Sequence, residues 1–453
     1  MYKYISIIFI LIFNCSSLAV DLHQALSSAY NNNDELKKIR SNLLIEIEDF
    51  AEAFSGFMPR ASMSFTENTT KNRWNNQLAA NLPNKQNIKM KQNAIVINQP
   101  VFNGGGSVAQ LKAAQESFRA SRANYYAQEQ KIILQLIETY LDCYAAKEKY
   151  EISEARVKSS QQNLDTTEEK LKLGESTTID LATAKANLAA AETNKLTQYA
   201  NYQAAKAAFA KAFGIEANNI SLPTMPGNLP STLESLTQRA ILVNPNIDYA
   251  RHSVSQSKAT EMVAKSALLP NVSIQLQQGK TFYNPQNIIT QQINDKSTTS
   301  VISVNVPIYA QGGAEYSKIR KSKNQTRLAV IQLDNNTKLV RAQSIGAWEN
   351  YEAAKSKVIA TAQGVEAAQV SYDGTVQEEI VGSKTILDVL MAEDKLNDAK
   401  ISKVDAHKES VLSAYQMKAL VGELTAKSLR LSVKYFTPEE EFKTLKKKLF
   451  IGF

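Results

Sequence analysis

The sequence predicts a mainly helical protein with four β-strands, built twice over by an internal duplication. Gly and Pro number only 16 and 11 in 453 residues, so few residues interrupt the helices. Leu22 to Gly214 resembles Leu233 to Gly422, with an offset of 211 at the first two matching positions and 208 at the last three. The matching pairs are Asn33/Asn244, Pro59/Pro270, Pro100/Pro307, Gly174/Gly382, Asp180/Asp388 and Gly214/Gly422. A repeat of this length indicates a duplicated unit rather than a solenoid.

The N-terminus has the features of a secretory signal peptide. Lys3 precedes an apolar run over residues 5–13, and small residues at 17 and 19 fit a cleavage site, so we expect residues 1–19 to be removed. The apolar run is too short for a membrane-spanning helix. Cys15 lacks the small preceding residue that lipidation favours, so we do not expect a lipid anchor.

Each half is expected to contain a helix, a strand, a long loop, a second strand, a very long helix, a tight turn and a last helix. The first repeat covers 20–221 and the second covers 222–430, before a C-terminal periplasmic tail at 431–453. The expected helices are 22–57, 107–172, 178–213, 233–268, 314–381 and 386–421, and the expected strands are about 60–69, 92–101, 271–279 and 299–308.

The strands alternate apolar and polar residues, with polar loops at 70–89 and 281–297 between them. The alternating apolar sets are Ala61/Met63/Phe65, Ile95/Ile97, Val272/Ile274/Leu276 and Ile302/Val304/Val306. This length and pattern are typical of strands in a membrane barrel. Four strands cannot close a barrel, whereas three copies of the chain would supply twelve. A soluble two-hairpin domain on a helical stalk is the alternative.

The two long helices run for about 65 residues without proline, which is roughly 100 Å at 1.5 Å per residue. Their apolar residues recur every seven positions, as in a coiled coil. One such stripe is Leu136, Cys143, Tyr150, Val157, Leu164 and Leu171. Nearer the strands two stripes face nearly opposite ways, which favours a helix in the wall of a cylinder with a neighbour on each side. An ordinary bundle with an Ala-rich core is the alternative.

Composition argues against several other classes of protein. The three histidines lie far apart and the two cysteines are too few for a zinc cluster, so we expect no metal and no cofactor. The net charge of +8 comes from interspersed charges of both signs, so we expect no nucleic-acid partner. No nucleophile, base and orienting group form a recognisable motif, so we do not expect an enzyme.

The sequence segments that occur in the same order in both repeats resemble those of the TolC family of outer-membrane efflux proteins. These segments are the two strand–helix junctions and the two Gly-centred turns. The junctions are Asn-Gln-Pro-Val-Phe-Asn-Gly-Gly (98–105) and Asn-Val-Pro-Ile-Tyr-Ala-Gln-Gly-Gly (305–313). The junction residues are Pro59, Pro100, Gly104, Gly105, Pro270, Pro307, Gly312 and Gly313. The resemblance covers residues 20 to 430.

The resemblance implies a homotrimer whose shared twelve-stranded β-barrel spans the outer membrane and whose helical barrel extends into the periplasm of a Gram-negative bacterium. It implies docking to a periplasmic adaptor (membrane fusion) protein and an inner-membrane pump of the RND or ABC type. The chain would then be the exit duct of a tripartite efflux system or a type I secretion system. The sequence does not choose between those two. A periplasmic or surface coiled-coil structural protein is the alternative function.

The resemblance also places a gate at the two tight turns. Leu173, Gly174, Val381 and Gly382 would form the periplasmic tip where the adaptor docks. Asp180 and Asp388 would match acidic gate residues, Lys384 stands where the family often has a bridging arginine, and Glu379 stands where it has a linking tyrosine. Met391 stands where a second aspartate can occur, so a second acidic ring is in doubt although Glu393 and Asp394 are near. Read without the family, each aspartate would be a residue that caps a helix.

Overall fold

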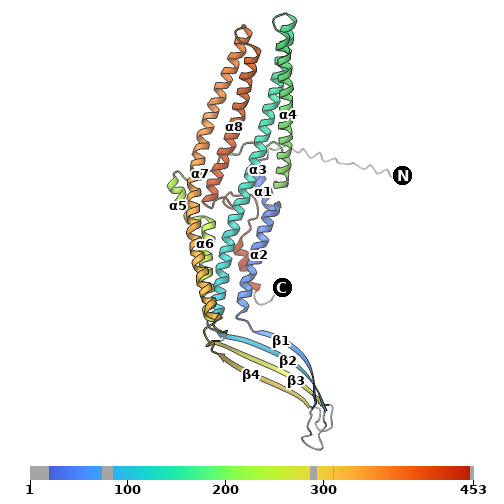
Figure 1. Ribbon diagram of the computed structural model, residues 1–453, viewed down its shortest axis with the longest axis vertical. Helices are drawn as coiled ribbons and strands as arrows, with labels where there is room; N and C mark the ends of the chain where they lie inside the picture. The colour runs from blue at the N-terminus through green and yellow to red at the C-terminus, as the bar shows by residue number, and fades with distance from the viewer. Residues whose placement is uncertain (1–19, 74–84, 286–292, 310, 449–453) are drawn as a thin grey trace, which may run out of the picture. The chain divides into compact units, whose positions relative to one another are not determined.

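The computed structural model describes residues 20–73, 85–285, 293–309 and 311–448 (Figure 1). The predicted signal peptide, its cleavage site and Cys15 lie outside these residues. In chain order the elements are α1 (Leu22–Asn32), α2 (Asp34–Ser55), β1 (Arg60–Arg73), β2 (Lys85–Asn103), α3 (Gly106–Lys172), α4 (Thr178–Phe213), α5 (Leu233–Val243), α6 (Pro245–Ser266), β3 (Asn271–Pro285), β4 (Ile293–Asn305), α7 (Ala314–Ile380), α8 (Ile386–Leu420) and α9 (Pro438–Lys448).

The chain folds into two compact units. The first, here called the tip unit, consists of the described residues within Met1–Ser41, Tyr125–Ile247 and Thr337–Phe436. The second, the sheet unit, consists of those within Asn42–Asn124, Asp248–Asn336 and Thr437–Phe453. The long helices α3 and α7, of 67 residues each, contribute to both units. Their ends lie within one residue of the ranges expected from the sequence.

The single helices expected at 22–57 and 233–268 are wrong, because an asparagine divides each of them. Asn33 separates α1 from α2, and Asn244 separates α5 from α6; both have an extended backbone with ψ near 125°. The Asn33 Oδ1 accepts a hydrogen bond from the N–H of Glu35 at 3.0 Å, and Asn244 Oδ1 accepts one from Asn246 at 2.9 Å. Each asparagine therefore ends one helix and caps the next.

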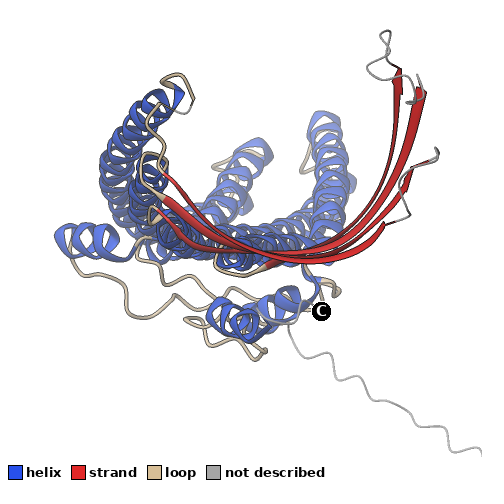
Figure 2. Ribbon diagram, turned by 90° about the horizontal axis from the view of Figure 1, so that it is seen from below, coloured by secondary structure: helices blue, strands red, loops and turns tan. Residues whose placement is uncertain are grey.

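The four strands form one antiparallel sheet in the order β1-β2-β3-β4, and Figure 2 shows them curving together. The register places Met63 opposite Ile95, Ile97 opposite Leu276, and Ile274 opposite Ile302. Alternate residues face opposite sides of a sheet, so the predicted apolar sets share one face. That face is exposed: the side chains of Met63 and Ile302 are 61% and 72% accessible. The outer edges of β1 and β4 pair with no other described strand.

The strands extend further than expected into the segments between them. β1 reaches Arg73 and β2 begins at Lys85, although the sequence predicted a polar loop over 70–89. β3 and β4 likewise take up part of the predicted loop at 281–297. In the first hairpin mostly polar residues pair across the strands there, among them Lys71 with Asn87 and Asn72 with Gln86, which the apolar alternation could not indicate. The remaining predicted loop residues, 74–84 and 286–292, lie outside the described residues.

The junction residues lie between strands and helices. Pro59 and Pro270 directly precede β1 and β3, and Pro100 lies in β2 at a shift in the pairing register, where a strand tolerates proline. Gly104 and Gly105, with φ of +64° and +78°, turn the chain from β2 into α3. A Cβ at Gly104 would lie 2.5 Å from the carbonyl oxygen of Ser266, so this turn requires glycine. Pro307 follows β4, and Gly312 and Gly313 precede α7 with φ of +61° and +88°.

The main hydrophobic core of the tip unit packs α1, α3, α4 and the segment after α8 together. Tyr140, Phe209 and Phe213 are fully buried at its centre. The Tyr140 hydroxyl lies within hydrogen-bond distance of the carbonyls of Val20 and Ser221, at 2.9 and 3.0 Å. Of the predicted stripe, Leu136, Cys143 and Leu164 are buried, and Cys143 is a free thiol.

The C-terminal tail contains a helix, α9, that the sequence analysis did not predict. Phe442 of α9 stacks on Phe118 with ring centroids 4.0 Å apart and meets Phe50 edge-on at 4.8 Å. Arg122 of α3 forms an ion pair with Glu439 at 3.1 Å. The signals were present in the sequence, since Pro438 suits a first helical position, with acidic residues in the first turn and lysines in the last.

Candidate functional site: the tip turns

Two turns in the tip unit, between α3 and α4 and between α7 and α8, have the same structure. In the first, Gly174 has a φ of +80° and the N–H of Glu175 donates to the carbonyl of Lys170 at 2.8 Å. In the second, Gly382 has the same φ and Ser383 donates to Glu378 at 2.8 Å. This six-residue closure with a left-handed glycine is a Schellman motif, which satisfies carbonyls at the end of a helix.

Each turn is followed by a capping box. The N–H of Asp180 donates to the Thr177 hydroxyl at 3.1 Å, and the N–H of Thr177 donates to the Asp180 carboxylate at 3.0 Å. Thr385 and Asp388 repeat the arrangement at 3.3 and 2.9 Å. Both predicted gate aspartates therefore stabilise the first turn of the next helix.

Hydrogen bonds in the capping boxes hold both carboxylates in the charged form. The hydroxyl and then the backbone N–H of Thr177 lower the pKa of Asp180 below its ordinary value. The backbone N–H and the hydroxyl of Thr385 do the same for the pKa of Asp388, and the nearby charge of Lys384 adds to the effect. Capping and negative charge are compatible roles, because a carboxylate at a helix N-terminus is favoured by the helix dipole.

Glu379 lies in an ion pair that the sequence analysis missed. Lys170 Nζ of α3 lies 2.7 and 2.9 Å from the two carboxylate oxygens of Glu379 of α7. The two side chains are only 28% and 20% exposed, so the pair is partly shielded from water. It links the ends of the two long helices within one chain. Lys384, by contrast, is exposed, and among the described residues it forms no ion pair.

Four apolar side chains stand out from the turns into solvent. Leu173 and Val381 are 74% and 77% exposed, and Ile179 and Leu387 are 75% and 54% exposed. Ile179 and Leu387 were not predicted, although they are related by the same offset of 208 as the other tip residues. We call these four residues the apolar tip patch. Large exposed apolar side chains at corresponding positions of both turns make these turns a candidate binding surface.

Glu393 and Asp394, the carboxylates near Met391 in sequence, contact α3. Glu393 is 4% exposed and accepts a hydrogen bond from Asn163 at 3.4 Å, and burial raises its pKa above the ordinary value. Asp394 forms an ion pair with Arg156. Met391 is 48% exposed. Glu393 and Asp394 therefore join α8 to α3 in the wall of the tip unit.

An antiparallel sheet with one exposed apolar face, in a chain that also has two helices of 67 residues, fits the class of outer-membrane channel proteins. The chain belongs to the outer membrane efflux protein family, whose model matches residues 25–215 and 236–423 and so matches each repeat separately. The resemblance to the TolC family that the sequence suggested is thereby confirmed. So are the predicted location in the outer membrane and the predicted class of efflux or secretion channel.

Known relatives include both kinds of exporter. The chain is 28% identical to the outer membrane efflux protein BepC of Brucella suis over 96% of this chain and 92% of that protein. It is 21% identical to the proteases secretion protein PrtF of Dickeya chrysanthemi over 85% of this chain and 84% of that protein. The solved CmeC outer membrane channel of Campylobacter jejuni has the same fold, with a TM-score of 0.77 at 16% identity over 94% of this chain and 89% of that one.

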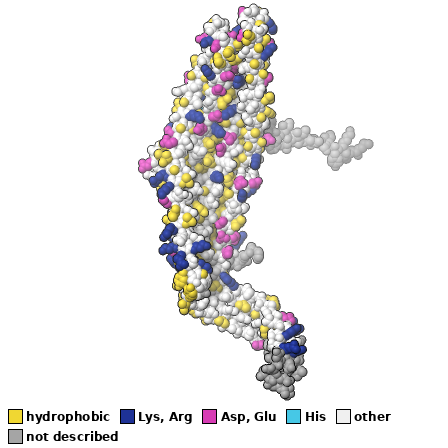
Figure 3. Space-filling view, viewed as in Figure 1, with side chains coloured by type: hydrophobic (Ala, Val, Ile, Leu, Met, Phe, Trp, Pro, Cys, Tyr) yellow, Lys and Arg dark blue, Asp and Glu magenta, His cyan; other side chains and the backbone are white. Residues whose placement is uncertain are grey.

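None of the described helices has the length and apolarity of a membrane-spanning helix. Nor do three or more His, Cys, Asp or Glu side chains group as metal ligands anywhere in the described residues. Charged side chains of both signs are interspersed along the face drawn in Figure 3.

Substituting the glycine of a tip turn tests its backbone geometry. We expect Gly382→Ala to speed hydrogen exchange of the following amides about five- to thirtyfold, because a left-handed L-residue costs roughly 1–2 kcal/mol. Gly374→Ala is the matched control, since it lies inside α7 and its Cβ, like that of Gly382, would meet no atom within 4 Å. The control should slow local exchange, because alanine favours a helix. Equal effects of the two substitutions would contradict this account of the turn.

Proposed function

We propose that three copies of the chain form one duct that carries solutes across the periplasm and the outer membrane. The observation that carries this proposal is the four-stranded sheet, which has one exposed apolar face and two edges that pair with no other described strand. Pairing β4 of one copy with β1 of the next would close a ring of twelve strands and leave no edge in lipid. With threefold rotational symmetry the head-to-tail strand pairing closes into a ring of three chains and does not continue as an open filament.

The apolar tip patch and the tip glycines are proposed to dock a periplasmic adaptor, which joins the duct to an inner-membrane pump of the RND or ABC type. The two similar turns of each chain would present six similar surfaces in a trimer. Exposed Leu173, Ile179, Val381 and Leu387 would each lose accessible area on docking, which favours association. Both efflux and secretion relatives use this fold, so the proposal extends to either type of pump.

The same region is proposed to keep the duct closed at rest. Three copies of Asp180 and Asp388 would gather negative charge at the tip, and Lys384 beside Asp388 would reduce it locally. The Lys170–Glu379 ion pair would hold the two helical hairpins of each chain together. Opening then requires breaking this link and separating helix ends, without any change in covalent bonds.

Removing the tip charge without removing the caps tests the acidic gate. Asp180→Asn with Asp388→Asn keeps an oxygen acceptor for each cap, and it should raise the Mg²⁺ concentration that half-blocks single trimers in a planar bilayer by about tenfold. The control, Thr177→Ala with Thr385→Ala, removes a cap bond and keeps both charges, so block should persist. If the control weakened block and the asparagine variant did not, the aspartates would act only as caps.

Breaking the ion pair tests the link between the hairpins. We expect Lys170→Met to raise the resting open probability about fivefold, since a partly shielded pair contributes up to roughly 1 kcal/mol. Lys172→Met removes the same charge from an exposed lysine without an ion-pair partner among the described residues, and it should change little. The exchange of charges in Lys170→Glu with Glu379→Lys should restore closure. A double variant as open as Lys170→Met would refute the link.

A further inference from the structure

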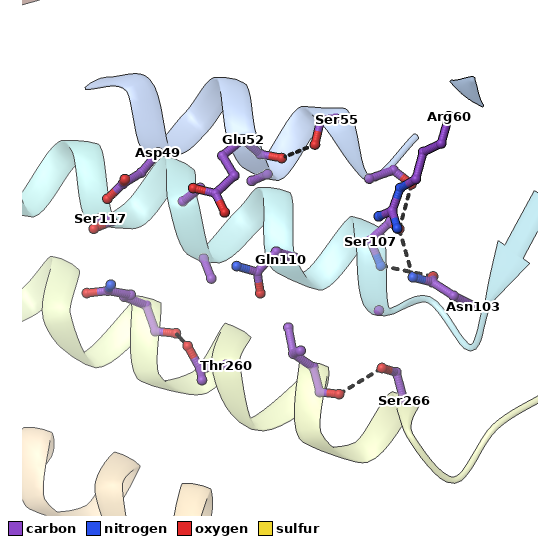
Figure 4. A pocket seen from close by; sticks show the side chains of 17 residues that line it. Asp49, Glu52, Ser55, Arg60, Asn103, Ser107, Gln110, Ser117, Thr260 and Ser266 are labelled. Atoms are coloured by element: carbon purple, nitrogen blue, oxygen red, sulfur yellow. Dashed lines mark hydrogen bonds between the residues drawn. The ribbon is translucent and has the colours of Figure 1, made fainter. Parts of the chain in front are cut away.

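A polar pocket of about 600 Å³ lies in the sheet unit, among α2, α3 and α6 and beside the ends of β1 and β2 (Figure 4). Its volume is in the range of sites that hold drug-sized molecules. Charged and hydrogen-bonding side chains dominate its wall, chief among them Asp49, Glu52, Arg60, Gln110, Ser117 and Thr260.

The charged groups of this pocket are available to a ligand. The side chains of Asp49, Glu52 and Arg60 form no ion pair or hydrogen bond with any described residue. Neighbouring polar groups are instead occupied: the Asn103 side-chain N–H donates to the Ser107 hydroxyl at 2.8 Å, and the Ser107 N–H donates back at 2.9 Å. Figure 4 shows Asp49 and Arg60 toward opposite ends of the pocket, with Glu52 between α2 and α3. The pocket therefore has an acidic end and a basic end.

The strand register indicates which way the basic end of the pocket faces. Arg60 shares the parity of Ser62 and Ser64 on the polar face of the sheet, opposite the apolar face. In a membrane barrel the polar face lines the lumen.

We propose that this pocket is a transit site for small zwitterionic solutes in the duct. An ammonium group would bind Asp49 and Glu52, and a carboxylate or phosphate group of the same solute would bind Arg60, while amide and hydroxyl groups between them supply hydrogen bonds. A simple cation would be repelled by Arg60 and a simple anion by the two carboxylates. All three charges remain in contact with water, so binding is weak and reversible, as passage requires. The inference rests on the proposed function, because the pocket faces a lumen only in the assembled duct.

Two penicillins that differ by one amino group test this proposal. Ampicillin carries an ammonium and a carboxylate group, and benzylpenicillin carries the carboxylate alone. Added to single trimers in a planar bilayer, ampicillin should interrupt the ion current with residence times about tenfold longer than those of benzylpenicillin, the effect of one charge-assisted hydrogen bond. Asp49→Asn with Glu52→Gln should remove this difference, and Arg60→Gln should shorten the residence of ampicillin.

Glu441→Gln is the matched control, since it removes one carboxylate from an exposed position of α9 that does not line the pocket. It should leave both residence times unchanged, and the ion current of every variant in salt alone should show an intact channel. Open channels that both penicillins interrupt equally, or variants that change neither, would overturn the transit site and leave the duct standing. The absence of any channel from the wild-type protein would overturn the duct, and the transit site with it.

Discussion

Backbone pairing at the edges of the sheet is the constraint on which the rest of the structure depends. β1 and β4 have 14 and 13 residues, and about half of the N–H and C=O groups of an edge strand point outward, where no other described strand pairs with them. In hydrocarbon each such group costs several kcal/mol, so an open sheet of this size is not viable there. The apolar face requires lipid and the edges require further strands. Assembly is therefore the condition for membrane insertion.

Duplication explains how one chain supplies a symmetrical framework. The glycine turn, the capping box and the asparagine that divides two helices each occur twice, with closely similar hydrogen bonds. Some features occur in only one of the two repeats. Lys170 corresponds by offset to Glu378, so the Lys170–Glu379 link has no copy in the second repeat. The acidic and basic ends of the pocket involve α2 and β1 of the first repeat alone.

Much of the fold could be predicted because the spacing of apolar residues and the positions of Gly and Pro are local signals in the sequence. The alternation of apolar and polar residues predicted the apolar face of the sheet. The seven-residue repeat of apolar residues, uninterrupted by proline, predicted the long helices. The division of helices at Asn33 and Asn244 was missed, because their apolar spacing continues across the joint; the capping asparagine and Pro245 were the available signals. The helix α9 was missed because its many charges are also typical of a disordered tail. What holds it in place is the packing of Phe442 against Phe50 and Phe118, which are distant in sequence.

The candidate site was only partly predictable. The tip turns could be located, because a glycine followed by Thr and Asp is typical of the end of one helix and the capped start of the next. The partner of Glu379 could not, because Lys170 lies 209 residues away in sequence and only the fold brings the two together. The pocket in the sheet unit was hidden for the same reason: Asp49, Arg60 and Thr260 come from separate elements, and no spacing in the sequence relates them.

The molar mass of the mature protein extracted in detergent tests the central claim most directly. Light scattering, corrected for bound detergent, should give a mass near three protomers for material recovered from the outer-membrane fraction. A water-soluble monomer or dimer would leave the edges of β1 and β4 unpaired, and it would contradict the shared barrel and the duct built on it.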